Sequence, residues 1–193
     1  HLLLRGLAAW LNGAESAEAA RAALLRLRLP QQRLRAGCVP IRIDPSGRLR
    51  VLLIRSRKHP EWFTFPAGGV ERGETLQQAA ARETVEEAGV RGRLGRRVAR
   101  VEEPKARTVM FSLHVLAELD QWDESGRERC WFDMGVPGSP GAPAAVAAVR
   151  AALSPKPVHQ RVLDQVAAVA SDLAKEGELN EQASRQCGAP LRA

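Results

Sequence analysis

The sequence predicts an α/β sandwich in which helices cover a mixed β-sheet. Strand-like segments lie before and after one central helical segment, residues 76–88, and further helical segments follow toward the end of the chain. This order brings strands far apart in sequence into one sheet with helices packed on it. Hydrophobic residues make up 45% of the 193 positions, which supports one domain-sized core.

The first strands are expected to form a hairpin. Segments 36–44 and 49–57 flank residues 44–47, Asp-Pro-Ser-Gly, a composition typical of tight turns. The aromatic segment 62–69, WFTFPAGG, then reads as a third strand that ends at Pro66 and leads toward the central helix.

The central helix is expected at Leu76 to Ala88. Leu76, Ala80, Thr84 and Ala88 recur every four residues and would face the core. Gly89 follows directly and suits a left-handed helix cap.

The second half predicts three strands and two helices. The strands are expected at residues 91–101, 108–119 and 128–132, and the glycine- and proline-rich stretch 135–143 reads as a loop. Helices are expected at 144–153 and 158–173.

This pattern places a single domain at residues 35–175. Residues 1–34, rich in Ala, Leu and Arg, are expected to form a helical extension, with the remnant of an organelle transit peptide as the alternative. Residues 176–193 read as a flexible tail.

The charge predicts an anionic partner. There are 29 Lys and Arg against 22 Asp and Glu, a net charge of +7, which alone does not separate nucleic acid from a small polyanion. Three cysteines without CxxC spacing indicate free thiols in a reducing compartment. The sequence contains no run of about 20 apolar residues and therefore predicts no membrane-spanning helix. We therefore expect a cytoplasmic or nuclear monomer without membrane association, with an organelle left open.

Three carboxylates on the central helix predict a metal site. Glu83, Glu86 and Glu87 stand at i, i+3 and i+4 and therefore project from one face. Arg82 alone cannot balance their repulsion, whereas Mg²⁺ or Mn²⁺ takes oxygen ligands of this kind. Glu74, near the helix start, is placed to reach Arg82 and to help orient the carboxylates. For the triplet alone, a solvated Glu-rich helix is the alternative.

The complete set of fixed positions resembles the Nudix box. The matching residues are Gly68, Glu74, Arg82, Glu83, Glu86, Glu87 and Gly89, with Val90 at the closing apolar position. Thr84 departs from the pattern, where an aliphatic residue is usual. The resemblance implies a Nudix-type α/β/α sandwich with the Nudix loop-helix-loop, and metal-dependent hydrolysis of phosphoanhydrides.

The resemblance also implies roles for the box residues. Glu83 and Glu87 would be the principal metal ligands, completed by the carbonyl of Ala67, with Glu86 as a further ligand or the general base. Whether Glu86 or Glu87 is the base stays open at this point. Arg82 and Glu74 would complete the catalytic group.

The basic flanks resemble the diphosphoinositol polyphosphate phosphohydrolases, in the plant and algal type. The similar segments are RAGCVPIR (35–42), RKHP (57–60), KART (105–108), GRERCWF (126–132) and KPV (156–158). The resemblance implies that substrate phosphates bind at Arg35, Arg42, Ser56, Lys58, Gly68, Gly69, Lys105, Arg107, Arg127 and Lys156. Ala67 and Pro155 depart from the residues usual in animal members.

Two other functions stay open on the sequence. One is hydrolysis of diadenosine polyphosphates or of other nucleoside diphosphates linked to a further group, including the mRNA cap. The other is a Nudix-fold binding protein without catalysis. The expected partner is a small polyanion, and no nucleic acid other than capped RNA is expected.

Overall fold

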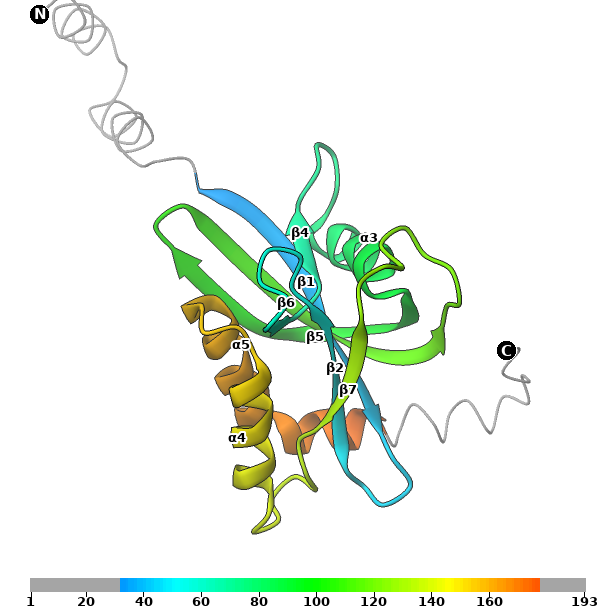
Figure 1. Cartoon of the computed structure of the whole chain (residues 1–193), viewed down its shortest axis with the longest axis vertical. Helices are drawn as coiled ribbons and strands as arrows, with labels where there is room; N and C mark the ends of the chain where they lie inside the picture. Colours follow the sequence, from blue (N-terminus) through cyan, green and yellow to red (C-terminus); the bar gives the residue numbers. More distant parts are fainter. Residues whose placement is uncertain (1–31, 178–193) are drawn as a thin grey trace, which may run out of the picture.

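The computed structural model of the protein describes residues 32–177, which form a seven-stranded sheet with helices on both faces (Figure 1). The predicted extension at 1–34 and tail at 176–193 lie almost entirely outside these residues. The strands are β1 (Arg33–Ile43), β2 (Leu49–Arg55), β3 (Phe63–Thr64), β4 (Ala67–Gly69), β5 (Val90–Glu103), β6 (Ala106–Glu118) and β7 (Arg129–Asp133).

The sheet is mixed, as the sequence predicts. The path runs β3-β2-β1-β6-β5, with β4 paired to β1 and β7 paired to β2. Strands β1 and β6 are parallel, with Arg35 opposite Thr108, and the other named strand pairs are antiparallel.

The strand predicted to end at Pro66 is shorter than expected, since β3 covers only Phe63–Thr64, and a separate strand, β4, follows Pro66 at Ala67–Gly69. Strands β1 and β2 pair only next to their turn and then diverge, so β3 continues along β2 while β4 continues along β1. Pro66 lies between them without an N–H to donate, and its carbonyl accepts a hydrogen bond from the Cys38 amide at 3.2 Å. The chain therefore leaves the sheet toward the central helix from β4, beside β1.

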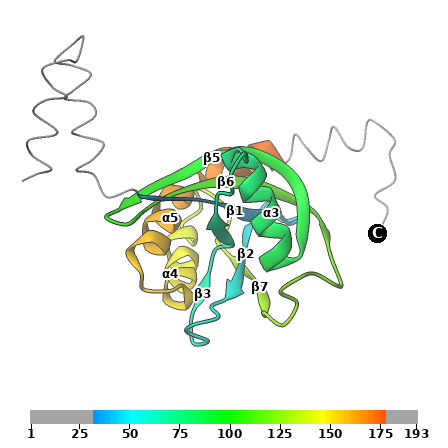
Figure 2. The same ribbon diagram turned by 90° about the horizontal axis from the view of Figure 1, so that it is seen from above.

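Helices cover both faces of the sheet (Figure 2). Both faces carry apolar side chains, because successive residues of a strand point to opposite faces. One face of the sheet packs on α3 (Leu76–Ala88) through Cys38, Leu52 and Phe111, and the other packs on α4 (Ala142–Ala152) and α5 (Pro157–Ala168). This arrangement confirms the predicted α/β/α sandwich.

Helix α3 confirms its predicted bounds. Thr75 and Gln78 form a capping box at its start, and Gly89 ends it with φ of 60°. Arg129 of β7 donates hydrogen bonds to the carbonyls of Ala88 and Gly89, which stabilises the negative end of the helix dipole. The helix is thus fixed at both ends.

The C-terminal helix departs from its prediction. A single helix was expected at 158–173, but α5 ends at Ala168, and a further helical segment occupies 170–177. Val169 has φ of −110° and its amide donates to Val166, which tightens the turn and redirects the chain so that Leu173 is fully buried. This segment crosses the domain boundary expected at 175. None of the helices within 32–177 has the length and apolar character needed to cross a membrane.

Candidate active site

The box carboxylates meet the backbone of β4. The Glu87 carboxylate accepts a hydrogen bond from the Ala67 amide at 2.9 Å. The Glu83 carboxyl lies against Gly68, so close that a Cβ atom there would stand 2.0 Å from Glu83 Cδ. Two carboxylates of helix α3 therefore lie at adjacent residues of strand β4.

Arg82 links the acidic residues of the box. Its guanidinium donates to Glu74 at 2.8 and 3.1 Å, so the contact expected from the sequence is present. It also donates to Glu83 and Glu86, each at 3.0 Å, and to the Gly69 carbonyl at 3.0 Å. One side chain thus orients two of the three helix carboxylates.

The electrostatics of the carboxylates differ. The hydrogen bond from Arg82 lowers the pKa of Glu74. Burial raises the pKa of Glu83, against the lowering effect of the Arg82 hydrogen bond, and the negative charges of Glu87 and Glu86 raise it further. A nearby cation would therefore stabilise the charged form of Glu83.

Two further arginines reach the remaining predicted metal ligands. Arg127 donates to Glu87 at 2.8 Å, and Arg35 donates to the Ala67 carbonyl at 2.6 Å. Within residues 32–177, no three Asp, Glu, His or Cys side chains converge as a ready-made metal site. Instead, every predicted ligand oxygen group contacts a guanidinium.

The donor set nevertheless fits a hard divalent cation. Glu83 and Glu87 are anionic oxygen donors at one short strand: Glu83 lies against Gly68, Glu87 accepts from the Ala67 amide, and the strand also carries the Ala67 carbonyl. Oxygen donors of this kind are those that Mg²⁺ and Mn²⁺ prefer. Glu86 contacts Arg82 but has no recorded contact with β4, and at 35% its side chain is the most exposed of the three.

A cavity of about 240 Å³ opens beside Ala67. Arg35 and Lys156, both predicted to bind substrate, line it together with Thr108, His159 and Glu103. Lys156 is the N-cap residue directly before helix α5, and His159 lies half-buried in the first turn of that helix. Burial, together with the positive charges of Lys156 and Arg35, lowers the pKa of His159 to about 4. The cavity is therefore cationic and borders the carbonyl expected to bind metal.

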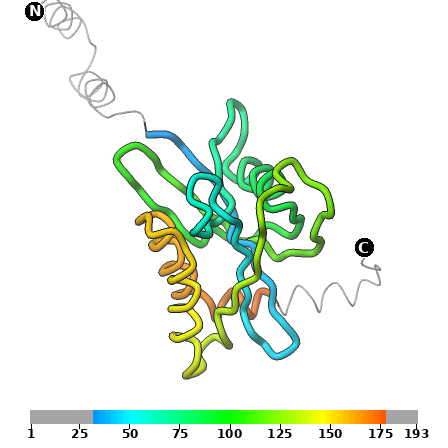
Figure 3. Tube along the Cα trace, in the orientation of Figure 1, coloured from blue at the N-terminus to red at the C-terminus, as the bar shows by residue number. Residues whose placement is uncertain are grey.

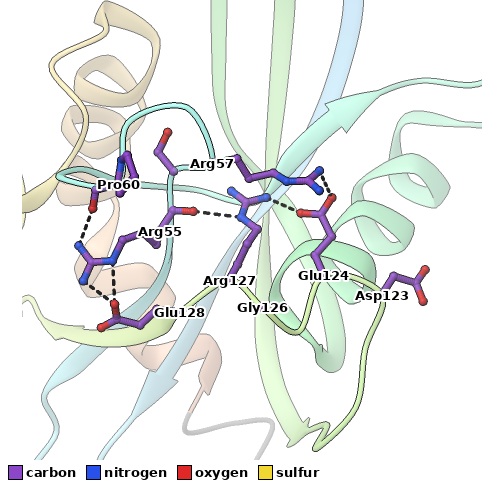
Figure 4. A pocket seen from close by; sticks show the side chains of 9 residues that line it. Arg55, Arg57, Pro60, Asp123, Glu124, Gly126, Arg127 and Glu128 are labelled. Atoms are coloured by element: carbon purple, nitrogen blue, oxygen red, sulfur yellow. Dashed lines mark hydrogen bonds and ion pairs between the residues drawn. The ribbon is translucent and has the colours of Figure 1, made fainter.

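A second, larger pocket of about 610 Å³ is lined by Arg127 (Figure 4), whose guanidinium also donates to Glu87. Ser56 and Arg127, predicted to bind substrate, line it with Arg55, Arg57 and Glu124. The pocket lies between the 56–61 loop and the 119–128 loop, and the latter runs beside α3 (Figure 3).

The other predicted substrate residues are more dispersed. Lys58 is exposed in the 56–61 loop, and Lys105 and Arg107 flank Ala106, which lines the smaller cavity. Gly69 faces open space. Arg42 lies near the far end of β1, about 20 Å from Arg35 by the rise of a strand, where it pairs with Glu118 and stacks on Trp131. The structure does not bring Arg42 into this group.

The pockets also contain residues that sequence reasoning did not assign to the site, among them His159, Thr108 and Glu124. His159 follows Lys156 by one helical turn, a spacing visible only once α5 is known to begin at Pro157. Thr108 lines the smaller cavity because β6 pairs in parallel with β1 and places Thr108 opposite Arg35. Glu124 lies in an irregular loop and gives no periodic signal.

Comparison with known proteins identifies a matching family and two similar relatives. Residues 31–149 match the family described as NUDIX domain. The chain is 42% identical over 103 residues to diphosphoinositol polyphosphate phosphohydrolase 2 of Rattus norvegicus, covering 51% of this chain and 56% of the relative. It is 40% identical over 104 residues to diphosphoinositol polyphosphate phosphohydrolase 3-alpha of Homo sapiens, covering 51% and 62% respectively. The alignments therefore span less than two thirds of these relatives.

A solved structure shares the fold. It is a NUDIX hydrolase from Nitrosomonas europaea, with a TM-score of 0.54 and 19% identity over 72% of this chain and 90% of that one.

Proposed function

This chain belongs to the NUDIX domain family, and from that premise we propose that it is a Mg²⁺- or Mn²⁺-dependent hydrolase of phosphoanhydrides. Its substrate is proposed to be a diphosphoinositol polyphosphate, from which it removes the β-phosphate. The observation that carries the proposal is the convergence of Glu83, Glu87 and the Ala67 carbonyl beside a cavity lined by Arg35 and Lys156.

The proposed metal ligands are Glu83, Glu87 and the Ala67 carbonyl. A divalent cation bound there would neutralise charge on the non-bridging phosphate oxygens. Arg82 and Glu74 keep Glu83 oriented through the hydrogen bonds described above.

Glu86 is our choice for the general base. It is the most exposed of the three helix carboxylates, and Arg82 Nη1 donates to its Oε2 at 3.0 Å. In the proposed reaction, Glu86 accepts a proton from water while the water oxygen bonds to phosphorus and the bridging P–O bond breaks. Inorganic phosphate and an inositol phosphate leave.

The substrate assignment rests on charge. An inositol ring with six or more phosphates needs cations on several sides, and Arg35, Lys156 and Arg127 border the box from β1, α5 and the 119–128 loop. Phe65 is the one Phe, Tyr or Trp lining the smaller cavity and is only 3% exposed, so this cavity offers little benzene or indole surface for stacking a nucleotide base. The names of the relatives at about 40% identity support the same choice.

The direct test is phosphate release from a diphosphoinositol pentakisphosphate, beside diadenosine hexaphosphate and a capped dinucleotide, with Mg²⁺ and with EDTA. We expect preferential inositol pyrophosphate turnover that EDTA abolishes. Preferential nucleotide turnover would overturn the substrate assignment but not the hydrolase proposal.

Two variants test the chemistry. Glu87→Gln removes a metal ligand, and Glu86→Gln removes the base while leaving the other carboxylates in place. Both should lower kcat by orders of magnitude, but only Glu87→Gln should also weaken metal binding. Unchanged turnover in Glu87→Gln would overturn the assignment of Glu87 as a metal ligand, and absence of turnover in wild type with Mg²⁺ would overturn the hydrolase proposal.

A further inference from the structure

Arg127 is shared between two carboxylates. Its Nη1 atom donates to Glu87 at 2.8 Å. The same atom donates to Glu124 at 2.8 Å, and Nε donates to the Arg55 carbonyl at 3.0 Å (Figure 4). The Arg127 side chain is 11% exposed, so these partners define its position. Arg127 therefore bridges a proposed metal ligand and a residue outside the box.

Glu124 is itself fixed from two sides. Its second oxygen accepts a hydrogen bond from Arg57 at 2.8 Å, and its backbone amide donates to the Glu86 carbonyl at 3.0 Å. The 119–128 loop is therefore fastened to α3 directly beside the proposed metal ligands. Glu124 holds its carboxylate within reach of Arg127 whatever Glu87 binds.

We propose that Glu124 is a positioning residue that retains Arg127 when a divalent cation takes the Glu87 carboxylate. The inference rests on the proposed function, because it concerns the same site. A guanidinium and a divalent cation compete for one carboxylate, so a cation at Glu87 costs Arg127 one hydrogen bond. Glu124 lets Arg127 keep a second anionic partner and remain on the pocket wall, directed at substrate phosphate.

The consequence of losing Glu124 follows from charge. Without the Glu124 carboxylate, Glu87 is the anionic partner left to Arg127 among residues 32–177. Arg127 then competes more strongly with the metal for the Glu87 carboxylate. Metal affinity should therefore fall even though Glu124 is not a metal ligand. Removal of Arg127 as well should abolish the effect, because the competitor is gone.

The test measures Mn²⁺ affinity of the full chain by the electron paramagnetic resonance of free Mn²⁺, without substrate. We expect Glu124→Gln to weaken Mn²⁺ binding about tenfold, within the range seen when partners of metal ligands are changed. The matched control is Asp123→Asn, which lines the same pocket and removes the same charge one position away, and should leave Mn²⁺ affinity unchanged.

The double-variant cycle decides the mechanism. In an Arg127→Gln background, Glu124→Gln should change Mn²⁺ affinity by less than about twofold. A tenfold loss that persists there, or an unchanged affinity in Glu124→Gln alone, would overturn the proposal. Thermal unfolding of each variant shows whether it is folded. Arg57→Gln is a further control, because it removes a partner of Glu124 without touching Arg127 or Glu87. That variant leaves Glu124 to Arg127 and should not weaken Mn²⁺ binding.

Failure of the proposed hydrolase function can be distinguished from failure of the proposed role of Glu124. If wild-type protein binds Mn²⁺ but releases no phosphate from any substrate, the hydrolase proposal fails while the cycle still decides the role of Glu124. Absence of Mn²⁺ binding in wild type overturns both.

Discussion

The carboxyl group of Glu83 occupies the space in which a side chain at Gly68 would begin. A Cβ atom at position 68 would lie 2.0 Å from Glu83 Cδ and 2.1 Å from both carboxyl oxygens. Because the crowded atoms are the end of a flexible side chain, a methyl group there would displace Glu83 rather than disrupt the fold.

Gly68→Ala should therefore weaken metal binding with little loss of stability. We expect Mn²⁺ affinity to fall at least tenfold because Glu83 is moved from β4, while the melting temperature changes by only a few degrees. Calorimetric titration with Mn²⁺ measures the effect. Gly69→Ala is the matched control, since its Cβ would meet no atom within 4 Å and its Mn²⁺ affinity should stay that of wild type.

Glu74→Gln tests the orientation of Arg82. The substitution removes the charge that holds Arg82 by two hydrogen bonds, so Arg82 should fix Glu83 and Glu86 less well. We expect kcat to fall about 10- to 100-fold, as is typical when partners of metal ligands are lost. Steady-state kinetics measure it, and a kcat equal to that of wild type would contradict the role of Glu74.

The cationic cavity predicts an acid-sensitive histidine. The pKa of His159 is about 4, below its ordinary value of 6.5, so the unfolded chain binds the extra proton first as the pH falls. The stability contribution of neutral His159 should be complete above pH 6.5 and be lost as the pH falls toward 4. Denaturant unfolding at several pH values measures this slope.

His159→Gln is the control for that slope. It should reduce the pH dependence of unfolding between 6.5 and 4, and an NMR titration of wild type should place the His159 midpoint near 4. Burial also lowers the pKa of His114, so part of the slope should persist in the variant. A His159 midpoint at 6.5 would contradict the prediction.

Two arginines of β1 should differ in their effect on substrate. Arg35 lines the cavity beside Ala67, whereas Arg42 lies at the other end of the strand with Glu118 and Trp131. We expect Arg35→Met to raise KM for the inositol pyrophosphate by tenfold or more, and Arg42→Met to change KM less than about threefold. Equal effects would show that substrate reaches both ends of β1.

The end of helix α3 should be sensitive to a single methyl group. Gly89 has φ of 60°, and a Cβ atom there would lie 2.4 Å from the Trp122 ring. Gly89→Ala should therefore destabilise the fold by at least about 1–2 kcal/mol, the cost of a left-handed L-residue alone. Denaturant unfolding measures this, with Gly126→Ala as a control in open space.

The sequence predicted the parts of the fold that have strong local signals. The bounds of α3 follow from its four-residue repeat and from Gly89, and the hairpin of β1 and β2 follows from its turn composition. The division of 62–69 could not be predicted, because it depends on β1 and β2 diverging. The break at Val169 likewise depends on burying Leu173.

The candidate site also contains parts that the sequence predicts and parts that it does not. The box residues have fixed spacing on one helix, so their common face was readable from sequence. The contacts of Arg127 with Glu87 and Glu124 depend on the path of an irregular loop, and the position of Arg42 depends on which end of β1 adjoins β4. Neither is a local property of the sequence.

The parallel pairing of β1 and β6 has a consequence for how the protein folds. These strands are far apart in the sequence, and β2, α3 and β5 lie between them. Closing so long a loop costs chain entropy before any contact repays it, which makes such pairing slow compared with hairpins and isolated helices. The cavity wall formed by Arg35 and Thr108 should therefore appear late during refolding, after the carboxylate-bearing helix has acquired its structure.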